Sequence, residues 1–123
     1  MKINEISFVA YAVTDMKKAR AFYEGVLGLK PSPDFDGSKN PNFVEYNIGS
    51  GALAVGCAPG MFDPSTKGTS AALEVDDFDA AVQEMKEKNV PIVMGPHDFP
   101  ACRMVMLADP DGNRIALHKR KKG

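Results

Sequence analysis

The stretch ISFVAYAVTDM, residues 6–16, decides the fold, because a strand pattern runs directly into a helix start. Successive residues of 6–13 point to opposite faces, as in a strand whose two faces have different environments. One face holds Val9, Tyr11 and Val13, and the other holds Phe8, Ala10 and Ala12. The polar pair Thr14-Asp15 follows, and its side-chain oxygens can accept hydrogen bonds from the free N–H groups of a helix's first turn. The stretch therefore predicts a strand followed by a helix.

The same pattern returns 62 residues further along the chain. Adding 62 pairs Ala10 with Ala72, Val13 with Val75, Asp15 with Asp77, and Ala19 with Ala81. The second strand is expected over Ser70–Val75, and the second helix carries its apolar stripe at Phe78, Ala81, Val82 and Met85. Helix ends are expected near Gly25 and Gly28 in the first copy and near Asn89 in the second. The repeat predicts two copies of one structural unit.

Each predicted helix is followed by a weak strand and then a hairpin. The weak strands are expected near Leu29–Ser32 and Ile92–Met94, and the hairpins pair 42–48 with 52–57 and 104–108 with 114–118. The fold class is therefore α+β, with two βαβββ modules in tandem. Module one is expected at about 1–58, a linker at about 59–68, module two at about 69–119, and a basic tail at 120–123.

Composition narrows the functional class. The chain has 123 residues, of which 44% are hydrophobic, as is typical of one globular domain. Its net charge of −1 creates no overall electrostatic field that would attract nucleic acid. Residues 1–9 lack the continuous apolar run of a signal peptide, so we expect a cytoplasmic protein with no membrane partner. In a reducing compartment, Cys57 and Cys102 are expected to be free thiols.

The opening segment 8–29 and the closing turn 109–115, together with the repeat, resemble the vicinal oxygen chelate superfamily. That superfamily contains glyoxalases, bleomycin-resistance proteins and extradiol dioxygenases. The resemblance implies that the modules form a curled mixed sheet around a cavity, which in the family commonly holds a divalent metal and a small oxygen-bearing molecule. It also implies a homodimer, and leaves open whether modules pair within a chain or between chains.

The resemblance assigns the usual metal-ligand positions to Phe8, Ala54, Ser70 and Ala116. Phenylalanine and alanine offer no side-chain lone pair, and serine is a poor neutral ligand. A shift of two residues along the strands recovers only His118 as a potential ligand. We therefore expect no cofactor and no metal at the usual site, so a divalent metal could bind only through noncanonical ligands.

The face of the strands that would line the cavity carries small side chains around Phe8, which favours a binding pocket over close packing. Glu74 and His118 share this face and are the acid/base candidates, with the expectation that partial burial shifts the histidine pKa or raises the carboxylate pKa toward neutrality. A structural pairing of Glu74 with a nearby cation is the alternative. Of the neighbours Glu45 and Tyr46, only one can reach the cavity, and the sequence does not say which.

The segment 97–103 is predicted to be a hairpin, with a loop placement that could line the cavity mouth. It contributes His97, Cys102 and Arg103 as further ligand-binding candidates. Arg103 is interpreted as an anion clamp for a carboxylate-bearing ligand, and Cys102 as a free thiol more typical of a core than of a nucleophile.

The leading functional hypothesis is a small-molecule-binding protein of this superfamily. The alternative is a glyoxalase-like lyase or isomerase, or a dioxygenase, that uses displaced metal ligands such as His118, Glu74, Glu45 or His97. A third possibility is metal-free acid/base catalysis by Glu74 or His118. The sequence identifies neither the ligand nor a reaction.

Overall fold

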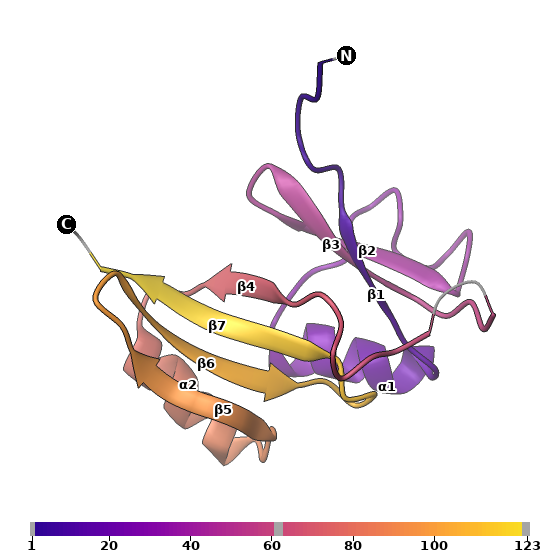
Figure 1. Cartoon of the computed structure of the whole chain (residues 1–123). Coiled ribbons are helices and arrows are strands. Elements are labelled where there is room, and N and C mark those ends of the chain that lie inside the picture. Colours follow the sequence, from indigo (N-terminus) through magenta and orange to yellow (C-terminus); the bar gives the residue numbers. More distant parts are fainter. Residues whose placement is uncertain (1, 61–62, 122–123) are drawn as a thin grey trace. The chain divides into compact units, whose positions relative to one another are not determined.

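The computed structural model describes residues 2–60 and 63–121, and the chain divides into two compact units, Met1–Pro64 and Ser65–Gly123 (Figure 1). The boundary lies within the predicted linker 59–68, of which residues 61–62 lie outside the described part. Of the predicted basic tail, residues 122–123 also lie outside it. The observed α+β architecture is the predicted fold class, with one copy of the repeat in each unit.

The first unit contains a three-stranded sheet and one continuous helical segment. Its elements are β1 (Val9–Ala12), α1 (Met16–Arg20), η1 (Ala21–Val26), β2 (Phe43–Ile48) and β3 (Gly51–Gly56). The strand order is β1-β3-β2, with β1 parallel and β2 antiparallel to β3. The helical segment begins as an α-helix and continues as a π-helix from Ala21.

The strand predicted at Leu29–Ser32 is wrong. Only one isolated bridge forms there, between Pro31 and Tyr46. Proline has no N–H to donate, and a second proline at position 33 follows immediately, so this segment cannot continue a ladder of hydrogen bonds. The first sheet therefore has three strands where the repeat predicted four.

The second unit contains a four-stranded sheet and one helix. Its elements are β4 (Ala71–Glu74), α2 (Phe78–Glu87), β5 (Ile92–Asp98), β6 (Cys102–Ala108) and β7 (Arg114–Arg120). The strand order is β4-β7-β6-β5. The strand predicted at Ile92–Met94 continues to Asp98. The predicted hairpin at 97–103 forms, but its arms are strands rather than a loop.

Both helices begin where the sequence predicted. The Oδ1 of Asp15 accepts a hydrogen bond from the Lys18 backbone N–H at 3.1 Å, and the Oδ1 of Asp77 accepts one from the Ala80 N–H at 3.1 Å. Each aspartate thus satisfies a donor that the first helical turn would otherwise leave unpaired. None of the described helices is long and apolar enough to cross a membrane.

Each unit buries one face of its sheet. In the first unit, Tyr46 is fully buried and stacks on Tyr23 of the helical segment, with ring centroids 6.1 Å apart. In the second, α2 lies along one face of the sheet (Figure 1), and its buried side chains Phe78, Val82 and Met85 contribute to the core together with Val105, Leu107, Ile115 and Leu117 of the strands. We call this the helix face of each sheet and the opposite side its open face.

Strand register places Glu45 on the open face. Glu45 pairs with Ala54, which pairs with Ala10, and the corresponding row of the second sheet is Met106, Ala116 and Ala72. Glu45 therefore corresponds to Met106, 61 residues further along the chain, and not to Leu107, which the shift of 62 indicated. The reason is that the second hairpin has one more residue between Met106 and Ala116 than the first has between Glu45 and Ala54. Tyr46 lies on the helix face.

Candidate functional site

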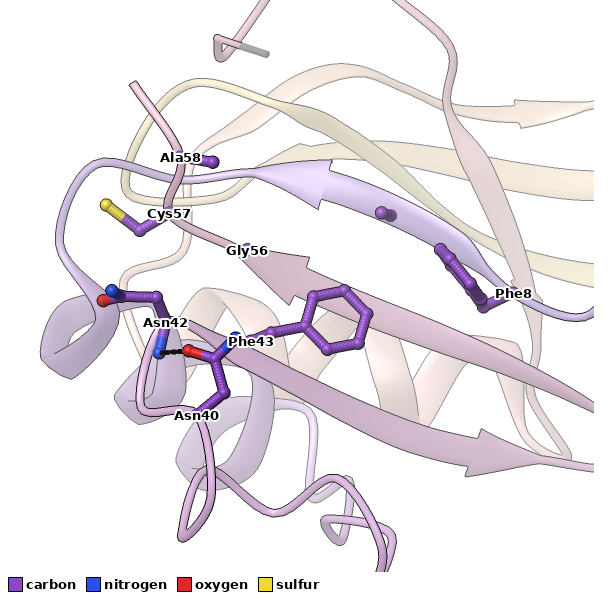
Figure 2. A pocket seen from close by; sticks show the side chains of 8 residues that line it. Phe8, Asn40, Asn42, Phe43, Gly56, Cys57 and Ala58 are labelled. Carbon is purple, nitrogen blue, oxygen red and sulfur yellow. Dashed lines mark hydrogen bonds between the residues drawn. The ribbon is translucent and has the colours of Figure 1, made fainter. Parts of the chain in front are cut away.

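A hollow of about 430 Å³ lies on the open face of the first sheet, entirely within the first unit (Figure 2). It is lined by Phe8, Ala10, Asn40, Asn42, Phe43, Gly56, Cys57 and Ala58. None of these residues is an acidic or basic amino acid. Its volume falls within the range of about 300–1,000 Å³ that small-molecule sites usually occupy.

The hollow exists because small residues lie beside large rings. Gly56, the last residue of β3, lies between Ala12 of β1 and Phe43 of β2 in the sheet register. Glycine has no side chain and Ala10 has only a methyl group, so little side-chain volume covers the sheet at this point. The rings of Phe8 and Phe43 stand beside it with centroids 5.8 Å apart and planes at 74°.

Phe43 is the centre of a small aromatic group. Its ring also meets that of Phe35 edge-on, with centroids 6.3 Å apart and planes at 89°. Phe8 is 45% exposed and Phe35 is 49% exposed, so both rings leave apolar surface uncovered. Covering such surface is favourable by about 25 cal/mol per Å². A ligand seated here would gain that contribution.

The other end of the hollow is polar. The Oδ1 of Asn40 accepts a hydrogen bond from the backbone N–H of Asn42 at 3.0 Å, and the Asn42 carbonyl accepts one from the Cys57 N–H at 2.9 Å (Figure 2 shows the former). These bonds hold the loop before β2 against the end of β3. The side-chain amide of Asn42 makes no hydrogen bond within the part of the chain that the structure describes, so it can offer a donor and an acceptor to a ligand.

A smaller hollow of about 160 Å³ adjoins the first and shares Asn40 and Phe43 with it. Its remaining lining residues are Asp34, Phe35, Gly37 and Lys39. Gly37 adopts a φ of +93°, and a Cβ there would lie 2.8 Å from the Arg20 guanidinium. The loop that contains Gly37 and lines the smaller hollow is therefore packed directly on the helical segment.

Of the site residues predicted from sequence, Phe8 lines the larger hollow. Ala54 and Ala116 are buried members of the open-face rows, and Ser70 immediately precedes β4. Ala10 and Gly56 were also expected on the cavity-facing side of the strands, and both line the hollow. Sequence reasoning missed the other lining residues, of which Asn40, Asn42 and Phe43 matter most. The signal that could have found them is the polar loop Asn40-Pro41-Asn42 ending on an aromatic strand residue.

The structure does not bring Arg103 to the hollow. Arg103 pairs with Asp98 on the helix face of the second sheet, where its guanidinium lies 3.0 Å from Asp79 and 4.5 Å from the centre of the Phe78 ring. The hydrogen bond with Asp79 raises the pKa of Arg103. The guanidinium thus already has an anionic partner and an aromatic one.

His97 and Cys102 lie in strands of the second unit, not in a loop. His97 pairs with Met104, and its ring lies 5.6 Å from that of Phe99. Cys102 pairs with Arg120, and both cysteines of the chain are free. These two candidates therefore lie in a different unit from the described hollow.

Glu74 and His118 are in direct contact across β4 and β7. The Oε1 of Glu74 lies 2.6 Å from Nδ1 of His118, and its Oε2 accepts a hydrogen bond from the Arg120 backbone N–H at 2.8 Å. The Arg120 N–H and then the His118 contact lower the pKa of Glu74. The expectation that burial would raise this pKa is wrong, because the side chain is 44% exposed and its charged form accepts two hydrogen bonds.

The residues at the four positions that the resemblance assigns to metal ligands are poor donors for a divalent metal. Phe8, Ala54 and Ala116 have no donor atom in their side chains, and Ser70 offers one neutral hydroxyl. Within residues 2–60 and 63–121, no group of three or more His, Cys, Asp or Glu side chains is placed to hold a metal ion. The side chains at these four positions suit contact with apolar groups better than coordination of a cation.

Comparison with known proteins shows the family. The family model of the Glyoxalase/Bleomycin resistance protein/Dioxygenase superfamily matches residues 5–117. The mitochondrial methylmalonyl-CoA epimerase of Bos taurus is 31% identical, over 80% of this chain and 65% of that protein. The chain thus spans slightly less than two thirds of that relative's length.

Solved structures share the fold over nearly the whole chain. An antibiotic-binding protein, TnmS3, from Streptomyces sp. CB03234 has a TM-score of 0.79 and 26% identity, with 98% of this chain and 99% of that chain covered. A superfamily member from Sphaerobacter thermophilus has a TM-score of 0.77 and 28% identity, with 96% and 98% covered. The chain belongs to the glyoxalase/bleomycin resistance protein/dioxygenase superfamily.

Proposed function

We propose that this protein binds a neutral, largely apolar organic molecule in the hollow bounded by Phe8, Phe43 and Asn42. The observation that carries the proposal is the lining itself, which combines aromatic rings with small side chains and has no charged group. A charged ligand would lose its hydration there without gaining an ionic partner, whereas a neutral one would lose little.

The geometry favours a planar ligand with one polar end. A flat ring can pack against the half-exposed Phe8 and against Phe43 in the offset or edge-on arrangements that aromatic pairs prefer. At the other end, the Asn42 amide can donate to a carbonyl or accept from a hydroxyl. One ring and one such group would use both parts of the site.

Two further observations support a binding role. Of the side chains at the predicted ligand positions, only Ser70 has a donor atom, and that donor is a neutral hydroxyl. In addition, one of the solved structures that share this fold is named as an antibiotic-binding protein, so the fold can serve binding. An anion-binding role for Arg103 forms no part of the proposal, since Asp79 already pairs with it.

The alternative is an enzyme of the superfamily, either a lyase or dioxygenase with displaced ligands or an epimerase like the curated relative. Activity that is lost on chelation and restored by one equivalent of divalent metal would favour it. Elemental analysis of protein purified without added metal, followed by titration with manganese, nickel, zinc and iron, is the direct test.

We also propose that the protein forms a homodimer in the cytoplasm. The segment before β1 supports association, because Ile3 and Ile6 are 82% and 71% exposed. Apolar side chains this exposed favour contact with another surface. Light scattering after size-exclusion chromatography is expected to give twice the mass of one chain, and a monomer that persists at high concentration would rule the dimer out.

A neutral fluorescent probe, N-phenyl-1-naphthylamine, tests the binding proposal. We expect saturable binding to the natural protein, and at least about 10-fold weaker binding after Ala10→Leu, because the larger side chain fills the hollow. Ala72→Leu is the matched control, since Ala72 occupies the same place in the second sheet's register and is also exposed. Equal affinity for the natural protein and a correctly folded Ala10→Leu variant would refute the assigned site.

A further inference from the structure

The smaller hollow lies beside the outer edge of β2, where residues 34–40 form a loop. In the sheet order β1-β3-β2, this edge of β2 has no partner strand. At the start of the loop, the Phe35 carbonyl accepts a hydrogen bond from the Glu45 N–H at 2.9 Å. At its end, the Asn40 carbonyl accepts one from the Phe43 N–H at 3.2 Å. Backbone hydrogen bonds therefore hold both ends of the loop against β2.

The middle of the loop is held by its packing on the helical segment. Gly37 has a φ of +93°, and a Cβ there would lie 2.8 Å from Nη1 of Arg20 and 3.3 Å from Cγ2 of Val44. Next to it, hydrogen bonds from Ser38, including one from its backbone N–H at 2.9 Å, lower the pKa of Asp36. The shape of the hollow is thus set by contacts of the loop itself, before any ligand binds.

Two charged side chains line this hollow, and neither has a partner within the protein. These are Asp34 and Lys39. Within residues 2–60 and 63–121, neither side chain makes an ion pair or a hydrogen bond. The nearby Arg20 already pairs with Glu24, with Nε and Oε2 2.6 Å apart. The hollow therefore offers one carboxylate and one ammonium group to a ligand.

Aromatic rings form another part of the lining. The rings of Phe35 and Phe43 meet edge-on, with centroids 6.3 Å apart and planes at 89°, and Phe35 is 49% exposed. Their surfaces favour contact with hydrocarbon, and the face of an aromatic ring also attracts a cation. The rings keep water away from one side of the hollow, which strengthens the attraction between opposite charges there.

The volume of the hollow limits the size of its ligand. About 160 Å³ equals the volume of roughly five water molecules at about 30 Å³ each. This lies below the range of about 300–1,000 Å³ in which drug-sized molecules bind. A ligand of the smaller hollow therefore has only a few non-hydrogen atoms.

We propose that the smaller hollow is a second binding site, and that its ligand is a small zwitterion of the α-amino acid class. The ammonium group of the ligand pairs with Asp34 and its carboxylate pairs with Lys39. An apolar side chain of the ligand packs against the two rings. Lys39 would repel a simple cation and Asp34 would repel a simple anion, whereas a zwitterion pairs with both charges.

This second site does not depend on the function proposed for the larger hollow. Asn40 and Phe43 line both spaces (Figure 2), but Asp34 and Lys39 line the smaller one alone. The larger hollow therefore suits a neutral molecule, and the smaller hollow suits a molecule that carries two opposite charges.

Amide NMR titration with L-leucine tests the proposal. Isocaproate is leucine without the ammonium group, and isoamylamine is leucine without the carboxylate, so all three probes share one hydrocarbon group. We expect leucine to cause saturable shifts of the Gly37 and Asn40 signals. Either analogue should bind about 5-fold more weakly, because each lacks one of the two charge pairs. An analogue that binds as tightly as leucine would overturn the assignment.

Substitution of the two charged residues should give a crossed pattern. We expect Asp34→Asn to weaken leucine and isoamylamine about 5-fold and to strengthen isocaproate, which Asp34 no longer repels. Lys39→Gln should weaken leucine and isocaproate and strengthen isoamylamine. Asp63→Asn and Lys86→Gln are the matched controls, since each removes a charge of the same sign from another exposed position. Leucine affinity that neither Asp34→Asn nor Lys39→Gln changes would refute the site.

The Ala10→Leu variant distinguishes this proposal from the one for the larger hollow. Its larger side chain fills the larger hollow, so it should weaken the binding of N-phenyl-1-naphthylamine and leave leucine affinity unchanged. Loss of leucine binding in a correctly folded Ala10→Leu variant would place leucine in the larger hollow and overturn the second site. Leucine binding to a natural protein that fails to bind the naphthylamine would support the second site and refute the first.

Discussion

Tyr46 donates its hydroxyl hydrogen to Oε2 of Glu24 across 2.9 Å, and so ties the centre of β2 to the helical segment of the first unit. The tyrosine is fully buried, and the same Glu24 oxygen lies 2.6 Å from Arg20 Nε. Arg20 in turn lies beside Gly37, which lines the smaller hollow. The Tyr46 hydroxyl thus connects β2, through Glu24 and Arg20, with the loop next to the proposed site.

Tyr46→Phe is expected to destabilise the protein by about 1–2 kcal/mol, because a buried hydrogen bond to a charged acceptor is lost while Arg20 still pairs with Glu24. Urea denaturation of Tyr46→Phe, Glu24→Gln and the double variant measures the coupling between the two residues. If the two single effects simply add, the hydrogen bond contributes nothing and the interpretation of this contact is wrong.

Stability is expected to fall at alkaline pH because of the same residue. Burial, followed by the hydrogen bond to Glu24, raises the pKa of Tyr46 above its ordinary 10.0. The contribution is fully present below pH 10.0 and is lost as pH rises toward the folded-state pKa, since the unfolded chain releases this proton first. Midpoints of urea unfolding between pH 9 and 11 should decline less in Tyr46→Phe, and identical slopes would contradict the assignment.

The two helix caps offer a matched pair of tests. Asp15→Ala and Asp77→Ala should each destabilise by about 0.5–2 kcal/mol, because each removes the acceptor of one first-turn N–H group. The caps share no partner, so the double variant should lose the sum of the two effects within about 0.5 kcal/mol. A markedly smaller loss in the double variant would show that the caps are coupled.

Asn42 is expected to form a hydrogen bond with the polar end of a ligand. In the natural protein, 2-naphthol should bind more tightly than naphthalene by about 2- to 10-fold, the contribution of one neutral hydrogen bond. Asn42→Ala should abolish this difference and leave naphthalene affinity close to that of the natural protein. Calorimetric titration of both compounds checks it, and a preference for 2-naphthol that survives the substitution would place the polar contact elsewhere.

The sequence predicted those parts of the fold that depend on local chemistry. The structure confirms the helix caps at Asp15 and Asp77 and the strand that follows each polar turn. It also confirms that β4 lies 62 residues after β1. Each of these features follows from short-range patterns of polarity and capping. The strand at Leu29–Ser32 failed for a local reason as well. Pro31 and Pro33 prevent the hydrogen bonds of a strand there, although the repeat predicted one.

The candidate site was predictable only in part, because register and packing decide it. Phe8 was expected from its place in the strand, but the facing of Glu45 is set by its pairing with Ala54, which the comparison with the second hairpin did not reveal. Arg103 illustrates the same limit. Its charge suggested an anion clamp, whereas its face is set by pairing with Asp98, which directs it to Asp79 and Phe78.

The most direct test of ligand binding in the hollow is methyl NMR on protein labelled with carbon-13 at alanine, titrated with N-phenyl-1-naphthylamine. Ala10 and Ala58 line the hollow, and Ala80 on α2 provides a reference in the second unit. We predict saturable shifts at Ala10 and Ala58 with little change at Ala80. Binding that shifts other alanines and leaves Ala10 and Ala58 unmoved would contradict the proposed site.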